Sequence, residues 1–202
     1  MNDTTNETVV ICCSVFRHEL DALVRAHWPD LKVRYIDSMM HMNPHHLAGL
    51  LLASVDEEIA CGHSVVIVYG DCCAEMESIE RRPNVARITG NNCVQILLGT
   101  EEYRRLSREG AFFLLPEWTH RWKEIFKQHL GLKEDNSLPM MQDMHSKLIY
   151  LDTGIIPIPE DAIRECAEFC RLPWEIQSVS LEVFYSNIQD TFHRLDNFQA
   201  KS

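Results

Sequence analysis

The sequence contains no long hydrophobic run and no segment with the character of a targeting signal. No apolar stretch approaches the roughly 20 residues that an α-helix needs to cross a bilayer. The opening residues, MNDTTNETVV, lack the basic and apolar regions of a secretory signal peptide. We therefore expect a cytoplasmic protein with no membrane-spanning segment.

Basic character is also scarce. The 202 residues include 19 Lys and Arg against 30 Asp and Glu, a formal charge of -11, and no run of more than two basic residues. Such an acidic chain repels phosphate backbones, so nucleic acid is not expected as the main partner. With 46% hydrophobic and 24% charged residues, the composition is that of a globular protein and not of a disordered, collagen-like or coiled-coil chain.

Several catalytic motifs are absent. The sequence has no Gly-x-Gly-x-x-Gly and no Walker loop, so it lacks a cradle for a dinucleotide or a nucleoside triphosphate. It has no Gly-x-Ser-x-Gly elbow for a serine hydrolase, and no Cys-x-x-Cys. These chemistries are therefore not expected.

Soft metal-ligand side chains, by contrast, are plentiful. The chain has 8 Cys, 10 His and 8 Met. Its cysteine content is below the roughly 8–10% of disulfide scaffolds, and thiols in the cytosol stay reduced, so structural disulfides are not expected. The cysteines can be core residues, reactive thiols or metal ligands, and their positions along the fold must decide among these roles.

Short β-branched and apolar runs alternate with helical patterns along the chain. Strands are expected at residues 8–13, 33–36, 64–70, 85–88, 111–116, 147–153 and 176–179. Helices are expected near residues 19–24, 44–62, 92–98, 103–106, 117–130, 159–170 and 184–192. This alternation predicts an α/β fold with a mainly parallel, Rossmann-like sheet flanked by helices, in a single domain over residues 1–202. The polar, Met-rich loop expected at 133–146 is the candidate boundary if the chain forms two small lobes.

Four soft-ligand residues follow four different predicted strands. Cys13 ends the first strand, His41 lies in the loop after the second, and Cys72 and Cys93 follow the third and fourth. In open parallel sheets, functional side chains gather beyond the carboxyl ends of the strands, which lie along one edge. The pattern therefore predicts one site that contains Cys13, His41, Cys72 and Cys93.

A metal or metallocofactor is the first interpretation of this site. Three thiolates and an imidazole suit tetrahedral zinc, whereas three thiolates with an open position suit an iron–sulfur cluster or a catalytic metal. The spacing of these four residues along the chain matches no zinc finger or ferredoxin. The interpretation therefore depends on their shared position at one edge of the predicted sheet. His41 and Asp71 are the candidates for proton transfer, and Tyr69, Gly70 and Asn92 are the candidates for holding a cofactor.

Two other interpretations remain open at this stage. In a thiol enzyme, Cys72 or Cys93 would be the nucleophile and His41 the base, since both thiols lie where a helix is expected to begin. In a non-catalytic partner protein, the helix with Trp118 and Trp122 and the Met-rich loop would be the contact surfaces. Three further cysteines are expected in the core, namely Cys61, Cys166 and Cys170.

Several segments together resemble a known family, the domain-of-unknown-function family numbered 1638. They are CCSVFRHEL (12–20), MHMNPHHL (40–47), VIVYGDCC (66–73), NNCVQILLG (91–99) and GAFFLLPEW (110–118). The resemblance implies that Cys13, His41, Cys72 and Cys93 fall on the Cys and His positions of that family. It also implies an association with corrinoid-dependent methyl-transfer systems, so a corrinoid protein or a methyltransferase is the implied partner, and a corrinoid cofactor is implied only indirectly.

The chain departs from the family pattern beside the predicted site. Cys73 stands where the family often has Gly, and Asn91 and Asn92 stand where it often has His and Asp. Both departures touch the site, so the bound species or its charge is expected to differ from that of relatives.

Overall fold

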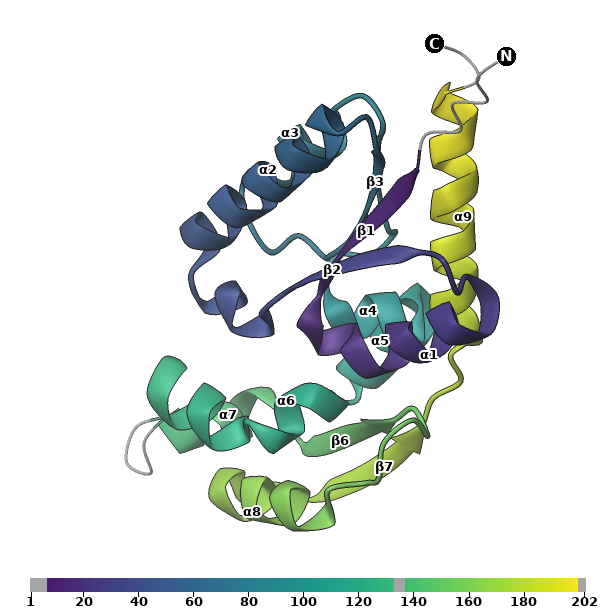
Figure 1. Cartoon of the computed structure of the whole chain (residues 1–202). Coiled ribbons are helices and arrows are strands. Elements are labelled where there is room, and N and C mark those ends of the chain that lie inside the picture. The colour runs from purple at the N-terminus through teal and green to yellow at the C-terminus, as the bar shows by residue number, and fades with distance from the viewer. Residues whose placement is uncertain (1–6, 133–136, 200–202) are drawn as a thin grey trace, which may run out of the picture.

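The computed structural model describes residues 7–132 and 137–199, and their strands form two separate parallel sheets (Figure 1). The strands are β1 (Thr8–Cys13), β2 (Lys32–Ile36), β3 (Ser64–Val68), β4 (Val85–Arg87), β5 (Ala111–Leu114), β6 (Lys147–Asp152) and β7 (Trp174–Ser178). The α-helices are α1 (Arg17–His27), α2 (Pro44–Ala60), α3 (Met76–Glu80), α4 (Cys93–Leu98), α5 (Thr100–Arg108), α6 (Pro116–His120), α7 (Ser137–Met144), α8 (Glu160–Cys170) and α9 (Glu182–Gln199). Two 3-10 segments and one π-helical segment complete the set: η1 (Ser14–Phe16), η2 (Ser38–Met42) and η3 (Glu124–His129).

The first sheet has the strand order β2-β1-β3-β4, and all its strands are parallel. Every residue of β3 is buried, as its continuous Val and Ile run predicts for a strand covered on both faces. Figure 1 shows α2 on one side of this sheet and α9 on the other. The order of the strands reverses between β1 and β3, which is where ligands bind in open α/β sheets.

The second sheet has the order β5-β6-β7 and its own hydrophobic core. The chain reaches it through α4 and α5, and then returns through α9, which packs on β3, β4 and α4 of the first sheet. The α/β class and the parallel pairing predicted from the sequence are confirmed. The strands divide between two such sheets, because β5 pairs with β6 and not with β4.

Two local expectations also need correction. The helix expected over 117–130 is interrupted, since α6 ends at His120 and the π-helical η3 begins at Glu124. The loop expected over 133–146 contains α7, whose Pro139 lies in the first turn, where a missing N–H removes no helical hydrogen bond. Residues 133–136 lie outside the described part of the chain, so the boundary expected at 133–146 stays a prediction. Strands of the second sheet nevertheless lie on both sides of that segment.

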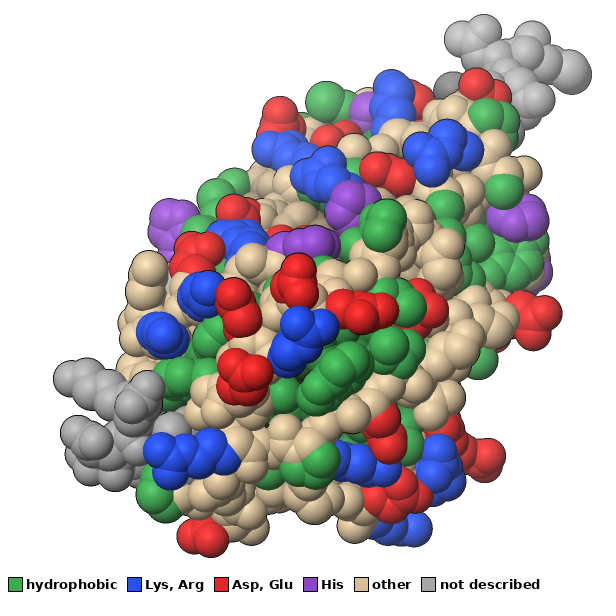
Figure 2. Space-filling view, turned by 90° about the horizontal axis from the view of Figure 1, so that it is seen from below, with side chains coloured by type: hydrophobic (Ala, Val, Ile, Leu, Met, Phe, Trp, Pro, Cys, Tyr) green, Lys and Arg blue, Asp and Glu red, His purple; other side chains and the backbone are tan. Residues whose placement is uncertain are grey.

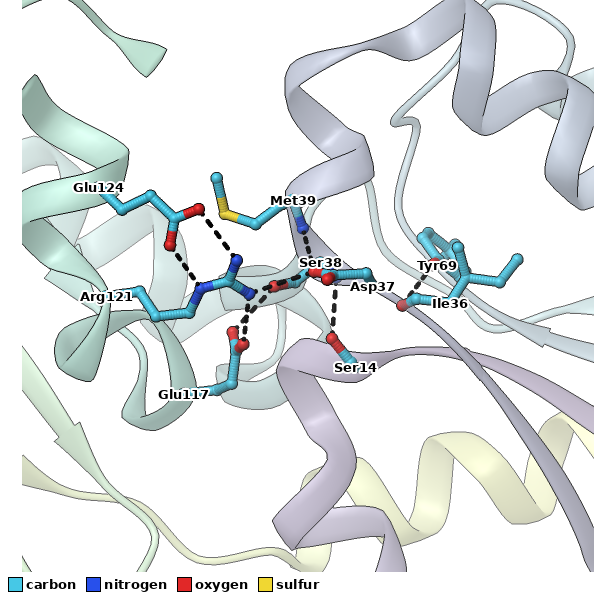
Figure 3. A network of polar contacts seen from close by, with 9 residues as sticks. All are labelled: Ser14, Ile36, Asp37, Ser38, Met39, Tyr69, Glu117, Arg121 and Glu124. Atoms are coloured by element: carbon cyan, nitrogen blue, oxygen red, sulfur yellow. Dashed lines mark hydrogen bonds and ion pairs between the residues drawn. The ribbon is translucent and has the colours of Figure 1, made fainter. Parts of the chain in front are cut away.

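We call the part of the molecule that contains the first sheet the first lobe, and the part that contains the second sheet the second lobe. Polar contacts join the two lobes (Figure 3). Arg121 of the second lobe contacts Asp37 at 3.2 Å, and the Ser38 hydroxyl donates to the Glu117 carboxylate at 3.0 Å. On another part of the interface, the Thr153 hydroxyl donates to the buried carboxyl group of Glu19 at 2.8 Å. Burial raises the pKa of that carboxyl group. The lobes are therefore held together by specific polar groups that lie beside the carboxyl edge of the first sheet.

The surface carries charges of both signs side by side. Figure 2 shows Lys and Arg next to Asp and Glu across one face, with hydrophobic side chains between them. Exposed ion pairs such as Lys123–Glu165 at 2.6 Å are typical of the described surface. Among residues 7–132 and 137–199, no helix is both long and apolar enough to cross a membrane.

Candidate functional site

The structure places the four predicted soft-ligand residues on the wall of one cavity. Cys13 is the last residue of β1, His41 lies in η2 after β2, Cys72 follows β3, and Cys93 begins α4 after β4. All four line a cavity of about 520 Å³ between the carboxyl edge of the first sheet and the second lobe. This volume lies within the range of small-molecule sites, about 300–1,000 Å³.

Gly70 lets the loops that carry Cys72 and Cys93 pack directly against each other. A Cβ atom at position 70 would lie 2.6 Å from the carbonyl oxygen of Asn91 and 2.7 Å from the Cα atom of Asn92. At the same contact, the Asp71 amide donates to the Asn91 carbonyl at 2.8 Å. Only glycine fits this backbone approach, so the residue type at position 70 determines how close the two cysteine loops lie.

His41 is held in η2 by contacts at both ends of the segment. The Asp37 carboxylate accepts a hydrogen bond from the Met39 amide at 2.9 Å at its start. The Ser38 amide donates to the Ser14 hydroxyl at 2.8 Å, which ties η2 to the end of β1 (Figure 3). After η2, the Asn43 side chain caps α2 by accepting a hydrogen bond from the His46 amide. The backbone that carries His41 therefore has little freedom, although the imidazole is exposed to solvent.

Cys72 and His41 form a hydrogen-bonded thiol–imidazole pair. The pKa of Cys72 is lowered to about 5, first by a hydrogen bond from the Cys93 thiol and then by the hydrogen bond and positive charge of His41, against an opposing effect of burial. The hydrogen bond to Cys72 in turn raises the pKa of His41. Cys72 is therefore an ionised thiol at neutral pH.

Two other groups along this wall, Cys93 and Tyr69, have raised pKa values. Hydrogen bonds with Cys13 and Cys72 raise the pKa of Cys93 well above that of an ordinary thiol. Burial, followed by the nearby thiols, raises the pKa of Tyr69, whose hydroxyl donates to the Ile36 carbonyl at 3.3 Å. The wall thus holds one thiolate, and Cys93 is a neutral donor beside it.

The second lobe forms the opposite wall, which sequence reasoning did not find. Its lining residues include Tyr103, Ser107, Phe112, Phe113, Met144 and His145. Trp118 also lines the cavity, and its ring centroid lies 5.9 Å from that of His41. Trp122, on the same segment, is instead buried in the core of the second sheet. These residues come from a lobe whose packing against the first sheet has no local signal in the sequence.

Two predicted site residues use their polar groups within the protein. Asp71 forms an ion pair with Arg87 at 2.9 Å, and the Asn92 side chain caps α4 by accepting from the Gln95 amide at 2.9 Å. Both still line the cavity. Their predicted roles toward a ligand stay predictions, and the contacts show what holds each side chain in place.

The remaining cysteines divide between core and surface. Cys166 and Cys170 are fully buried in the second core, as expected. Cys61 was expected in the core, and that expectation is wrong, because it lies exposed at the end of α2, where Gly62 turns the chain at the surface. Cys61 therefore provides an accessible thiol outside the cavity.

The four donor side chains determine whether this site can hold a metal ion. Their chemistry suits a soft metal, with three sulfurs and one imidazole. Among the described residues, however, no group of three or more His, Cys, Asp and Glu side chains is arranged to hold a metal ion. Instead the donors interact in successive pairs: Cys13 with Cys93, Cys93 with Cys72, and Cys72 with His41. The arrangement therefore does not fit a preformed metal site.

Comparison with known proteins gives a family and no activity. The model of the family described as "Protein of unknown function (DUF1638)" matches residues 35–188. No curated protein matches, and no solved structure matches. The metal, the iron–sulfur cluster and the corrinoid association therefore stay predictions.

Proposed function

We propose a thiol-dependent, group-transferring function for this chain, which belongs to the family described as Protein of unknown function (DUF1638). Cys72 is the nucleophile and His41 is the acid and base. The observation that carries this proposal is the placement of Cys72 between His41 and Cys93 on the wall of a cavity of ligand size. A nucleophile next to a proton carrier is the arrangement that nucleophilic catalysis requires.

The proposed reaction has two steps. In the first, the Cys72 sulfur attacks an electrophilic carbon of the ligand, and a carbon–sulfur bond forms as the bond from that carbon to its leaving group breaks. The leaving group departs with the bonding electron pair and takes a proton from the His41 imidazolium. In the second, water or a thiol takes the group from Cys72 and gives its proton to His41, which restores the starting pair.

The neighbours of Cys72 support this assignment over Cys93. Cys93 retains its proton because of its hydrogen bonds with Cys13 and Cys72, so it stabilises the neighbouring thiolate and is a poor nucleophile. Cys72 is also partly exposed, whereas Cys13 is buried. Cys72 is therefore the accessible and ionised member of the three.

Cys72 should react with iodoacetamide at pH 6 about eightfold faster than an ordinary thiol. A thiol with a pKa of about 5 is roughly 90% ionised at that pH, whereas one with a pKa of about 8.5 is roughly 0.3% ionised. The lower pKa makes each thiolate roughly fortyfold less nucleophilic, for a Brønsted slope of about 0.45. Site-resolved mass spectrometry at timed intervals measures the rate from pH 4 to 9. The labelling rate of Cys72 should rise with pH, level off above about pH 6 and have its inflection near pH 5.

Cys61 and free N-acetylcysteine amide are the comparison thiols in this experiment. A Cys72 rate at pH 6 no greater than that of N-acetylcysteine amide, with an inflection near 8.5, would overturn the proposed function. A Cys61→Ser variant should leave the Cys72 rate unchanged, because Cys61 lies outside the cavity.

A soft metal ion is the second candidate, since three thiols and an imidazole line the same cavity wall. Zinc or an iron–sulfur cluster would be held by Cys13, Cys72, Cys93 and His41 after their side chains rearranged from successive pairs into one coordination sphere. The nucleophile proposal needs no such rearrangement, and we therefore place it first.

Metal content and an absorption spectrum of anaerobically purified, untagged protein test the second candidate. A resident metal should be stoichiometric, should protect Cys72 from iodoacetamide, and should bind at least about tenfold more weakly in Cys93→Ala. The Cys61→Ser variant should retain full metal content. Finding no metal, and no thiolate-to-metal absorption on addition of Co²⁺, would remove this candidate and leave the thiol proposal.

A further inference from the structure

Among the described residues, the basic side chains that line the cavity containing Cys72 are the two histidines His41 and His145, with no Lys or Arg. Arg87, next to the cavity, is paired with Asp71 at 2.9 Å. The His41 imidazole is already hydrogen-bonded to Cys72. A phosphate or carboxylate group on a ligand would therefore have no Lys or Arg side chain to pair with, and much of its desolvation would be uncompensated.

Aromatic side chains form much of the wall opposite the thiols. Tyr103 and Phe113 pack with ring centroids 5.8 Å apart, and Phe112 contacts His145 edge to face at 5.1 Å. Both phenylalanines are only partly buried and line the cavity. Such rings favour the burial of a flat or apolar body.

The apolar wall continues into a smaller cavity of about 90 Å³. His41, Phe112, Phe113 and Trp118 line both cavities. The smaller one is otherwise lined by apolar side chains of η3 and its neighbours, including Trp122, Ile125 and Phe126. A ligand in the larger cavity therefore has an apolar extension available beside the reactive pair.

One polar group on this wall has no partner. Within the described residues, the Nε1 atom of Trp118 is buried and makes no hydrogen bond. A buried N–H without an acceptor is costly, and native structures normally satisfy it. The Nε1 atom itself is inaccessible in this arrangement, so an acceptor oxygen on a bound ligand reaches it only after a shift of the Trp118 ring, which lines both cavities.

We propose that the cavity selects an uncharged ligand with an aromatic or compact apolar body and a carbonyl oxygen that accepts a hydrogen bond from Trp118. The inference rests on the proposed thiol function for placing the electrophilic carbon near Cys72. Binding of such a ligand can nevertheless be measured without any reaction.

Acetanilide, an unreactive aromatic amide, is the probe for binding. It should bind stoichiometrically in calorimetric titration and quench tryptophan fluorescence, whereas benzoate, which has the same ring and a negative charge, should not bind. Trp118→Phe keeps a ring and removes the N–H, so it should weaken acetanilide binding about tenfold. Trp28→Phe makes the same change outside the cavity and should leave binding unchanged.

Iodoacetanilide has the ring and the amide of the probe and the reactive carbon of iodoacetamide. It should label Cys72 with saturation kinetics, competed by acetanilide, and the half-saturating concentration should rise about tenfold in Trp118→Phe while the iodoacetamide rate stays the same. Rapid labelling by iodoacetamide with no saturation by iodoacetanilide, and no acetanilide binding, would overturn the ligand class and retain the thiol function. Acetanilide binding with slow labelling by both reagents would overturn the thiol function.

Discussion

The double variant His41→Gln/Cys93→Ala is expected to label at Cys72 about eightfold more slowly than the unmodified protein with iodoacetamide at pH 6. It removes the Cys93 thiol, whose hydrogen bond lowers the pKa of Cys72, and it replaces His41 with a side chain that cannot carry a positive charge. The inflection of the rate should move up from about 5 toward the ordinary thiol value of about 8.5. Below pH 6 the loss should be greater. The two rates should cross near pH 7, and above about pH 9 the variant should label roughly thirtyfold faster, because both thiols are then largely ionised and the thiolate of higher pKa is the stronger nucleophile.

The single variants separate the two contributions. Cys93→Ala and His41→Gln should each move the inflection upward, because the hydrogen bond from Cys93 is the largest single cause of the lowered pKa and His41 contributes both a hydrogen bond and a positive charge. Cys93→Ser retains a donor and should give a smaller shift than Cys93→Ala. Cys61→Ser is the matched control outside the cavity. An inflection that stays near 5 in the double variant would contradict the assignment of these two partners.

Gly70→Ala is expected to destabilise the protein by about 3 kcal/mol, which corresponds to a fall in melting temperature of roughly 6–12 °C for a chain of this size. The added Cβ would lie 2.6 Å from the Asn91 carbonyl oxygen, and the neighbouring atoms are backbone, which cannot turn away. The loops that carry Cys72 and Cys93 must therefore move apart. The hydrogen bond between the two thiols should weaken, and the pKa of Cys72 should rise.

Gly49→Ala is the matched control for this variant. Gly49 is exposed within α2, and a Cβ there would have no neighbour within 4 Å. Alanine should therefore stabilise the helix by about 1 kcal/mol. Thermal unfolding followed by circular dichroism measures both variants, and iodoacetamide labelling below the transition reports on Cys72. Similar melting temperatures for the two variants would show that the backbone contact at Gly70 does not limit stability.

Local sequence patterns did not predict which strands share a sheet. The apolar runs identified all seven described strands, but β4 has only three residues, and the pattern does not say which strand lies beside it. Pairing is decided by contacts between segments far apart in the chain. The second sheet, its separate core and the return of α9 to the first sheet were therefore visible only in the structure.

The predicted site was found by a rule that needs only the order of strands and loops. In a parallel α/β sheet every strand points the same way, so residues that follow different strands meet at one edge. This reasoning placed Cys13, His41, Cys72 and Cys93 together without any knowledge of their distances. It failed for Trp118 and His145, because these side chains reach the same cavity from the other lobe.

From its pattern alone, the sequence determined that three cysteines and a histidine lie along one sheet edge. Only the tertiary structure decided that Cys72 has a lowered pKa and Cys93 a raised one, because a pKa depends on the groups that folding brings within hydrogen-bond reach. Cys72 receives a hydrogen bond from Cys93 and lies beside His41, whereas Cys93 is held protonated between two other thiols. The neighbours of each thiol come from separate strands and loops, and no spacing along the chain records how they meet.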